Sequence, residues 1–208
     1  MEILNAIADL SHHNRVADFA AAKDDGVLGI IHKATQGFRY LDPKYQSRRP
    51  KALDAGLMWG AYHFGVGGDG IAQAQYFLEV VRPEPTDLLV LDFEPNPGGR
   101  TMSIEEAEEF VEYIQHATGR WPGLYGGYYL KETLGNTTDT SLANCWLWFA
   151  RYGPPPKLPP AWPTWTMWQY TDGAAGDEPH AVEGIGYCDR DKFQGDLPAL
   201  QKLWGSET

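Results

Sequence analysis

The sequence has little cysteine, no long apolar run and a shortage of positive charge. Its two cysteines, Cys145 and Cys188, form no C-x-x-C pair, which excludes zinc-ribbon and thioredoxin-like motifs. Both stand in apolar or strand-like surroundings, so we expect buried free thiols, with a disulfide left open. No apolar run approaches the roughly 18 to 20 residues of a membrane-spanning helix.

Acidic residues outnumber basic ones by 28 to 17, which gives a formal net charge of -11. Phosphate binding needs clustered Lys and Arg, so this charge disfavours nucleic acid and an anionic membrane surface as partners. The first nine residues lack a basic leader and read directly into a strand. We therefore expect no secretory signal peptide.

The 208 residues are 43% hydrophobic and 13% aromatic, which predicts one packed domain over residues 1–208. Short apolar runs alternate with amphipathic segments, the pattern of a parallel α/β architecture. The expected strands are 3–9, 27–33, 57–64, 88–94, 123–127, 145–150, 164–170 and 186–189. The expected helices are 16–23, 44–55, 71–81 and 103–118, the last beginning with a capping box of Ser103 and Glu106.

The helical signal fades after about residue 130, and the proline-rich stretch 154–160 predicts an extended connection. We therefore expect loops, and no helices, between the later strands. The predicted fold class is α/β, an irregular TIM-like barrel with about five βα units followed by a β-rich C-terminal third.

The expected strand 88–94 ends in two carboxylates, Asp92 and Glu94. Side chains alternate along a strand, so these two face the same side and Phe93 faces the other. The four apolar residues before Asp92 do not alternate, which indicates a strand buried on both faces. Such a strand delivers its last residues to the carboxyl-end rim, and two acids there suit glycoside hydrolysis.

Repulsion between the two carboxylates supports this interpretation. Residues two apart on a strand lie roughly 7 Å apart, and at an effective dielectric of about 20 their charges repel by roughly 2.4 kcal/mol. This is enough to keep one carboxyl protonated near neutral pH while the other stays ionised. The alternative is that one or both carboxylates cap the next helix or pair with Lys or Arg.

Further polar residues end other expected strands. Asp9 ends the first strand, where a helix cap is the alternative role. Tyr62 ends the third strand and faces away from His63, which we interpret as a core histidine. Trp168 and Gln169 end the seventh, where they could hold a sugar, although packing is an equal alternative for Trp168.

Asp189 and Asp191 share a face at the end of the eighth expected strand, where Arg190 could be their partner at the surface. The alternative is that these residues form a solvated turn. We expect one rim to carry Asp9, Asp92, Glu94 and Asp189, with Tyr62 between them. A ring of acids without a basic counterweight indicates either catalysis or a bound cation. No H-x-H, D-x-D-x-D-G or H-E-x-x-H spacing is present, so we expect neither a metal nor a cofactor.

Taken together, these residues resemble the glycoside hydrolase family 25 lysozymes, the Chalaropsis-type muramidases. The matching segments are Asp9-Leu10-Ser11-x-x-Asn14, Gly60-Ala61-Tyr62-His63-Phe64, Leu91-Asp92-Phe93-Glu94, Trp146-Leu147-Trp148-Phe149-Ala150-Arg151-Tyr152, Trp168-Gln169-Tyr170 and Asp189-Arg190-Asp191-Lys192-Phe193. They follow the family's order and span nearly the whole chain.

The resemblance implies an irregular barrel and hydrolysis of the β-1,4 bond between N-acetylmuramic acid and N-acetylglucosamine in peptidoglycan. It implies that Glu94 is the general acid/base and that Asp92 orients the 2-acetamido group or stabilises the oxocarbenium-like charge. Asp9 and Asp189 would be flanking acids. The implied substrate contacts are Tyr62, Trp148, Gln169 and Asp191. The family usually has Asn at the position of Asp191, which leaves the roles of Asp189 and Asp191 open.

Carboxyl spacing alone does not decide between retention and inversion, and substrate assistance by the acetamido group is our first choice. Two other functions stay open. One is an inactive wall-binding module, which release of reducing ends would exclude; the other is a metal-dependent phosphodiesterase, which full activity in EDTA would exclude. We expect a monomer that acts on peptidoglycan strands, made in the cytoplasm and released like a phage endolysin, or secreted with its leader removed.

Overall fold

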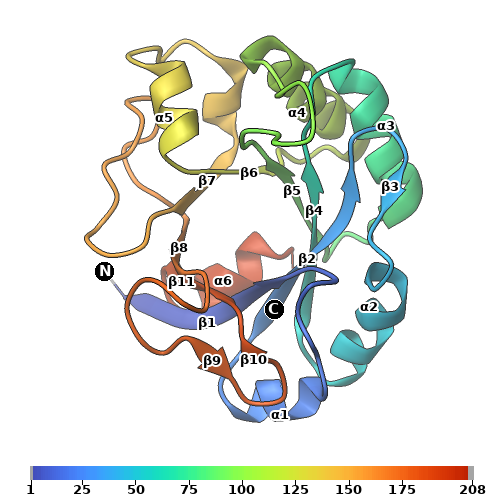
Figure 1. Cartoon of the computed structure of the whole chain (residues 1–208), viewed down its shortest axis with the longest axis vertical. Coiled ribbons are helices and arrows are strands. Elements are labelled where there is room, and N and C mark those ends of the chain that lie inside the picture. The colour runs from blue at the N-terminus through green and yellow to red at the C-terminus, as the bar shows by residue number, and fades with distance from the viewer. Residues whose placement is uncertain (1, 206–208) are drawn as a thin grey trace.

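Eight strands close into a barrel in the computed structural model, which describes residues 2–205 (Figure 1). Seven run parallel, namely β1 (Ile3–Leu10), β2 (Gly29–Gln36), β4 (Met58–Phe64), β5 (Leu88–Asp92), β6 (Gly123–Gly126), β7 (Trp146–Ala150) and β8 (Met167–Thr171). The eighth, β11 (Asp189–Gln194), lies antiparallel between β8 and β1, and the pairing of β1 with β2 closes the ring. The predicted α/β, TIM-like barrel is confirmed.

Helices follow each of the first five barrel strands and pack around the outside of the barrel (Figure 1). They are α1 (Phe19–Asp24), α2 (Tyr45–Asp54), α3 (Gly70–Val81), α4 (Ile104–Thr118) and α5 (Tyr128–Leu134). The predicted five βα units are therefore present. A short strand β3 (Tyr40–Leu41) extends β2 as a hairpin, and β9 (Ala181–Val182) pairs with β10 (Gly186–Tyr187) in a separate hairpin.

Two predictions about the helices were wrong. The first helix begins at Phe19, not at residue 16, because the Asp18 carboxylate caps the Ala20 N–H and the N–H groups of Ala17 and Asp18 bond to Gly184. The connection from β6 to β7 contains α5 and the 3-10 helix η1 (Ser141–Asn144), although loops alone were expected after residue 130. Elements this short carry too few turns to show a clear helical periodicity.

The eighth strand was also predicted wrongly. Residues 186–187 belong to the β9–β10 hairpin, and the barrel strand begins only at Asp189. The error arose because β11 presents charged residues to the barrel interior. Its sequence therefore lacks the alternation of apolar and polar residues that would identify it as a strand. Since β11 runs antiparallel, its first residues reach the rim formed by the carboxyl ends of its neighbours, and the register pairs Asp189 with Asp9.

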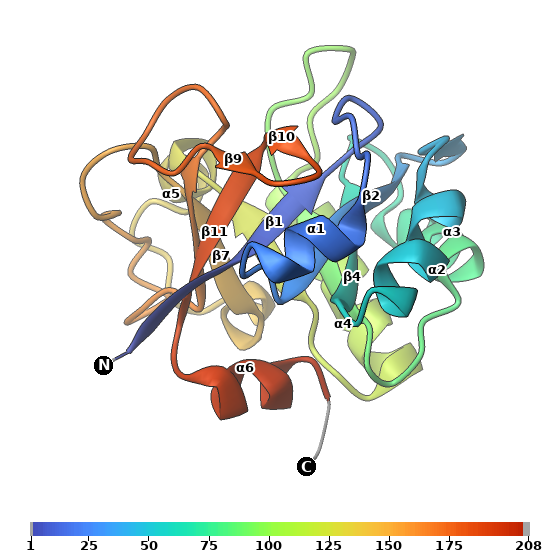
Figure 2. The same cartoon turned by 90° about the horizontal axis from the view of Figure 1, so that it is seen from below.

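The apolar core forms two layers, one outside the strands and one inside the barrel. The helix α6 (Leu197–Leu203) lies across the end of the barrel opposite the rim, as Figure 2 shows. Just after it, Trp204 enters the interior and donates from Nε1 to the Trp59 carbonyl at 2.9 Å. Gly29 leaves room for that ring, because a Cβ there would lie 3.1 Å from it.

The outer layer contains His63 and both cysteines. His63 is fully buried between the Thr35 hydroxyl at 2.7 Å and the Gln73 side-chain oxygen at 3.2 Å, so its interpretation as a core histidine is confirmed. Cys145 and Cys188 are buried free thiols, as expected. Within residues 2–205, every helix is too short or too polar to cross a bilayer.

Candidate active site

A cavity of about 110 Å³ opens at the rim of the barrel. It is lined by Asp9, Tyr62, Asp92, Glu94, Tyr125, Trp148, Gln169 and Asp189. Seven of these residues were predicted from the sequence, and the structure brings them together from six different strands and the residues that follow them. Tyr125 was not predicted, and Asp191 lies outside the lining.

The backbone after β5 directs both predicted carboxylates into this cavity. The strand ends at Asp92, but the Phe93 N–H donates to the Tyr125 carbonyl at 2.9 Å and the chain stays extended. Phe93 is fully buried in the outer layer, where it stacks on Tyr129 with ring centroids 5.6 Å apart. Asp92 and Glu94 therefore share the inner side, as the alternation predicted.

Both carboxyls titrate above their usual range. Burial raises the pKa of Asp92 well above its ordinary value, and the charge of Glu94 raises it further. Burial also raises the pKa of Glu94, with a second contribution from the charge of Asp189. A raised pKa favours the protonated form of each carboxyl, which is the form that a general acid needs.

Lys33 supplies the basic counterweight that the sequence did not reveal. Its ammonium lies over the Phe64 ring, 4.9 Å from the centroid, and donates to the Gln36 side-chain oxygen at 2.8 Å. Burial lowers the pKa of Lys33. Nearby carboxylates raise this pKa, and Asp92 contributes most among them. Lys33 does not line the cavity, but its ammonium lies close enough to favour ionisation of Asp92.

One oxygen of Asp92 is free to contact a substrate. Its Oδ1 atom is buried and accepts no hydrogen bond from the described residues, while the carboxyl lines the cavity. A buried acceptor without a donor costs about 1 to 3 kcal/mol. A ligand N–H or a developing positive charge placed in the cavity would remove that cost.

A hydrogen-bonded group forms the opposite wall. Gln169 donates from Nε2 to Asp9 at 2.8 Å, and its Oε1 accepts from the hydroxyls of Tyr125 and Tyr152, each at 2.9 Å. Burial raises the pKa of Asp9 well above its ordinary value. The second cause is the charge of Asp189, which pairs with Asp9 in the β1–β11 ladder. Burial raises the pKa of Asp189 to about 6.

Asp191 lies below the cavity. It is fully buried, and its Oδ1 accepts from the Trp148 indole N–H at 2.7 Å. Trp148 in turn packs edge-on against Tyr125, with ring centroids 4.7 Å apart. Arg190 points the other way and donates to the Ala181 carbonyl at 3.0 Å, so the expectation that it pairs with the neighbouring acids at the surface was wrong.

Three residues near the site escaped the sequence analysis, namely Lys33, Tyr125 and Tyr152. Tyr125 could have been found, because it lies within the expected strand 123–127, and it pairs with Asp92 in the β5–β6 register. Lys33 is the last residue of the expected strand 27–33, but its contact with the acids depends on which strands become neighbours. Tyr152 follows the expected strand 145–150 by two residues. Trp168 packs on the outer side, where it donates to the Arg151 carbonyl at 2.7 Å.

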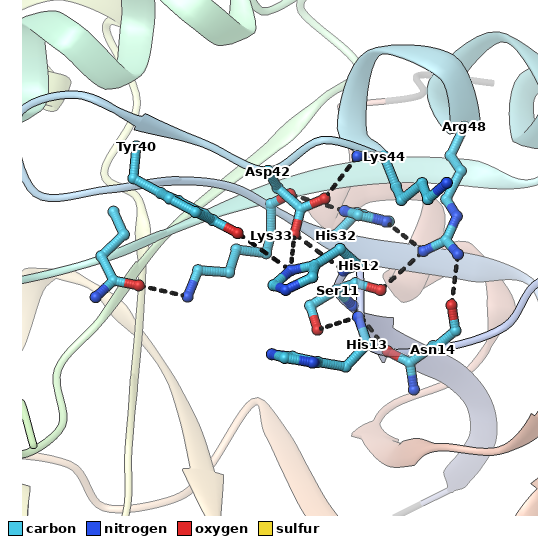
Figure 3. Close-up of polar contacts among 11 residues, drawn as sticks. Ser11, His12, His13, Asn14, His32, Lys33, Tyr40, Asp42, Lys44 and Arg48 are labelled. Atoms are coloured by element: carbon cyan, nitrogen blue, oxygen red, sulfur yellow. Dashed lines mark hydrogen bonds and ion pairs between the residues drawn. The ribbon is translucent and has the colours of Figure 1, made fainter.

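A polar network fixes the loop that follows Asp9 (Figure 3). Arg48 of α2 donates to the carbonyls of Ser11 at 2.8 Å and Asn14 at 2.5 Å, and lies 3.0 Å from His32 Nε2. Burial lowers the pKa of His32 to about 4, so its ring is neutral and accepts from the guanidinium. Within residues 2–205, no group of three His, Cys, Asp or Glu side chains is arranged to hold a metal ion.

Comparison with known proteins agrees with this geometry. Residues 8–177 match the family described as glycosyl hydrolases family 25. Lysozyme M1 of Streptomyces globisporus is 31% identical over 210 aligned positions, covering 94% of this chain and 69% of the relative. The bacterial lysozyme from Streptomyces coelicolor has a TM-score of 0.85 at 28% identity, covering 96% and 97% of the two chains. A family GH25 lysozyme from Aspergillus fumigatus has a TM-score of 0.80 at 33% identity, covering 97% and 99%. The chain therefore belongs to glycosyl hydrolase family 25 and is a glycoside hydrolase.

Proposed function

We propose that this peptidoglycan hydrolase is a lysozyme that cleaves the β-1,4 bond between N-acetylmuramic acid and N-acetylglucosamine. One observation carries the proposal. Asp92 and Glu94 open into the same rim cavity with raised pKa values, and none of the ion pairs among the described residues involves either of them. The alternative, that a cation or a helix cap occupies these carboxylates, is therefore not supported.

Glu94 acts as the general acid and then as the general base. It is the more accessible of the two carboxyls, whereas Asp92 is almost fully buried. In the first step the protonated Glu94 donates to the glycosidic oxygen as the bond to C1 breaks. In the second, the Glu94 carboxylate takes a proton from the water that attacks C1.

Asp92 acts on the 2-acetamido group of the sugar whose C1 is attacked. Its unsatisfied Oδ1 accepts the acetamido N–H, and the charge of the nearby Lys33 ammonium favours the ionised form of Asp92 against the effect of burial. So oriented, the acetamido oxygen attacks C1 and forms a cyclic intermediate with retention of configuration overall. This substrate-assisted route needs no second carboxylate within reach of C1.

The remaining lining residues hold the sugars. Asp9 and Asp189 flank the cleft, and Tyr62, Trp148 and Gln169 contact the substrate. Asp191 is a positioning residue, because it lies outside the lining and makes polar contacts with two residues of the cavity wall, the Trp148 indole and the Asp9 carboxyl. We further propose that the protein acts as a monomer and reaches the wall by release from the cytoplasm or by secretion.

Digestion of purified peptidoglycan, followed by mass spectrometry of the products, tests the proposal. Cleavage of the proposed bond leaves every new fragment with muramic acid at its reducing end. Fragments that end in reducing N-acetylglucosamine would assign the enzyme to the other glycosidic bond. Absence of any new reducing end would favour an inactive wall-binding protein.

A further inference from the structure

A second cavity, of about 660 Å³, adjoins the catalytic one and shares Glu94 with it. One wall comes from α5, and the other comes from the end of β7 and residues 151–157, which follow it. The two walls meet where Lys131 donates to the Lys157 carbonyl at 2.8 Å. We call this cavity the basic groove. Among the residues that the structure describes, its lining contains three cations, Lys131, Arg151 and Lys157, and one acid, Glu94.

This concentration of positive charge is unusual for the chain. The protein has a formal net charge of -11, and within residues 2–205 the adjoining catalytic cavity is lined by four carboxyls and no cation. Three cations around one hollow repel each other unless an anion or solvent separates them. A basic groove that begins at Glu94 is therefore complementary to an anionic part of the substrate.

Two of the three cations are free to bind while their backbone is held in place. The Arg151 N–H donates to the Gln169 carbonyl at 3.0 Å, and the Arg151 carbonyl accepts from the Trp168 indole at 2.7 Å. The side chains of Arg151 and Lys157 are exposed and have no hydrogen bond or ion pair to any residue in 2–205. A guanidinium held in this way can grip a carboxylate through two parallel hydrogen bonds.

We propose that the basic groove binds the carboxylates of the peptide stem carried by the muramic acid at the scissile bond. This inference rests on the proposed muramidase function, in which the sugar attacked at C1 is the one that bears the stem. Because Glu94 faces the scissile oxygen, a stem leaving that sugar starts at the shared edge of the two cavities. Tyr128 and Phe149, which also line the groove, offer apolar surface to the methyl groups of alanine residues in the stem.

Kinetics on three substrates test the proposal. These are purified glycan strands with acidic stems, the same strands after an amidase has removed the stems, and strands whose stem carboxyls are amidated. The variant is R151A/K157A, and R151K/K157R is the charge-conserving rescue. K51A/K202A is the matched control, because it removes two exposed cations from α2 and α6, outside the lining of both cavities.

For R151A/K157A we expect KM on acidic stems to rise about three- to tenfold with kcat nearly unchanged, since each exposed ion pair contributes a factor of a few. Added salt should shrink the difference. KM on stem-free and amidated strands should match the wild type, and R151K/K157R should restore most of the affinity. An equal loss on all three substrates, or no loss on the acidic stems, would overturn the proposal.

The same data separate this inference from the proposed function. If the wild-type enzyme releases no reducing muramic acid from any of the three substrates, the muramidase assignment fails. If it cleaves all three and R151A/K157A does not distinguish them, only the stem-binding inference fails.

Discussion

At the scale of single residues, burial controls the chemistry of the site more strongly than the contact between any two charges. Burial is the first cause of the raised pKa of Asp9, Asp92, Glu94 and Asp189. The sequence predicted the repulsion between Asp92 and Glu94 from their spacing. It could not predict desolvation, or the ammonium of Lys33, because both depend on which strands become neighbours.

The neighbouring charge of Asp189 helps to keep Glu94 protonated. Glu94 must carry a proton to act as the general acid, so activity is present below its pKa and is lost as the pH rises through it. Replacing Asp189 with Asn removes a charge that raises the Glu94 pKa. We expect the alkaline limb of kcat/KM to move to lower pH in D189N.

The pH profile of kcat/KM from about pH 4 to 9, in the wild type and in D189N, measures this shift. Asp54→Asn is the control, since it makes the same change in net charge at an exposed position of α2. An alkaline limb that stays in place in D189N, or moves equally in D54N, would show that Asp189 does not act on Glu94.

At the scale of elements, the sequence predicted those with a strong and long pattern. The buried run of β5 and the capping box of α4 were both identified, and Ser103 and Glu106 make the two reciprocal hydrogen bonds. The direction of β11 was missed, because Asp189 and Asp191 face the barrel interior where an apolar residue would ordinarily mark a strand. Asp189 nevertheless lies at the predicted rim, because an antiparallel strand begins at the rim where parallel strands end.

Asp191 of β11 should destabilise the barrel at neutral pH. Burial raises its pKa well above the ordinary value, so the folded state binds its proton more tightly than the unfolded chain does. The stability from that protonation is fully present below the unfolded pKa of about 3.9 and is lost as the pH rises through the folded value. Asp191→Asn keeps an oxygen for the Trp148 indole without the charge, so we expect it to raise the free energy of unfolding at pH 7 by about 1 to 3 kcal/mol.

Urea unfolding at several pH values checks this prediction. The advantage of D191N should shrink towards zero near pH 4. Asp172→Asn should instead lower the free energy of unfolding at pH 7, because backbone N–H groups, that of Ala175 first, lower the pKa of Asp172. If D191N were less stable than the wild type at pH 7, the ionised carboxylate would be contributing to stability, contrary to this account.

At the scale of the whole molecule, the closed ring of strands joins the first and last thirds of the chain. β1 pairs with both β2 and β11, and Trp204 enters the interior beneath the catalytic cavity. The sequence predicted the barrel and its five βα units from alternating patterns. It did not predict how the barrel closes or that α6 and Trp204 cover its lower end. The helix α6 is short, and its position depends on contacts with residues far away in the sequence.

A ring closed in this way should unfold as one cooperative unit, which we propose as the single domain. Tryptophan fluorescence and far-ultraviolet circular dichroism should report the same midpoint in denaturant. Trp204→Ala should lower both midpoints together, with a loss of about 3 to 5 kcal/mol. Two separate transitions, or a shift in only one probe, would indicate that the C-terminal third folds independently.

The central claim is that the proton transferred to the glycosidic oxygen comes from Glu94, and Glu94→Gln tests it most directly. The amide keeps the size of the side chain but cannot donate as an acid, so we expect kcat on purified peptidoglycan to fall about 10²- to 10⁴-fold. Binding to insoluble peptidoglycan should stay close to that of the wild type, and D54N should retain full activity. An E94Q enzyme that keeps more than a few per cent of the wild-type kcat would contradict the account.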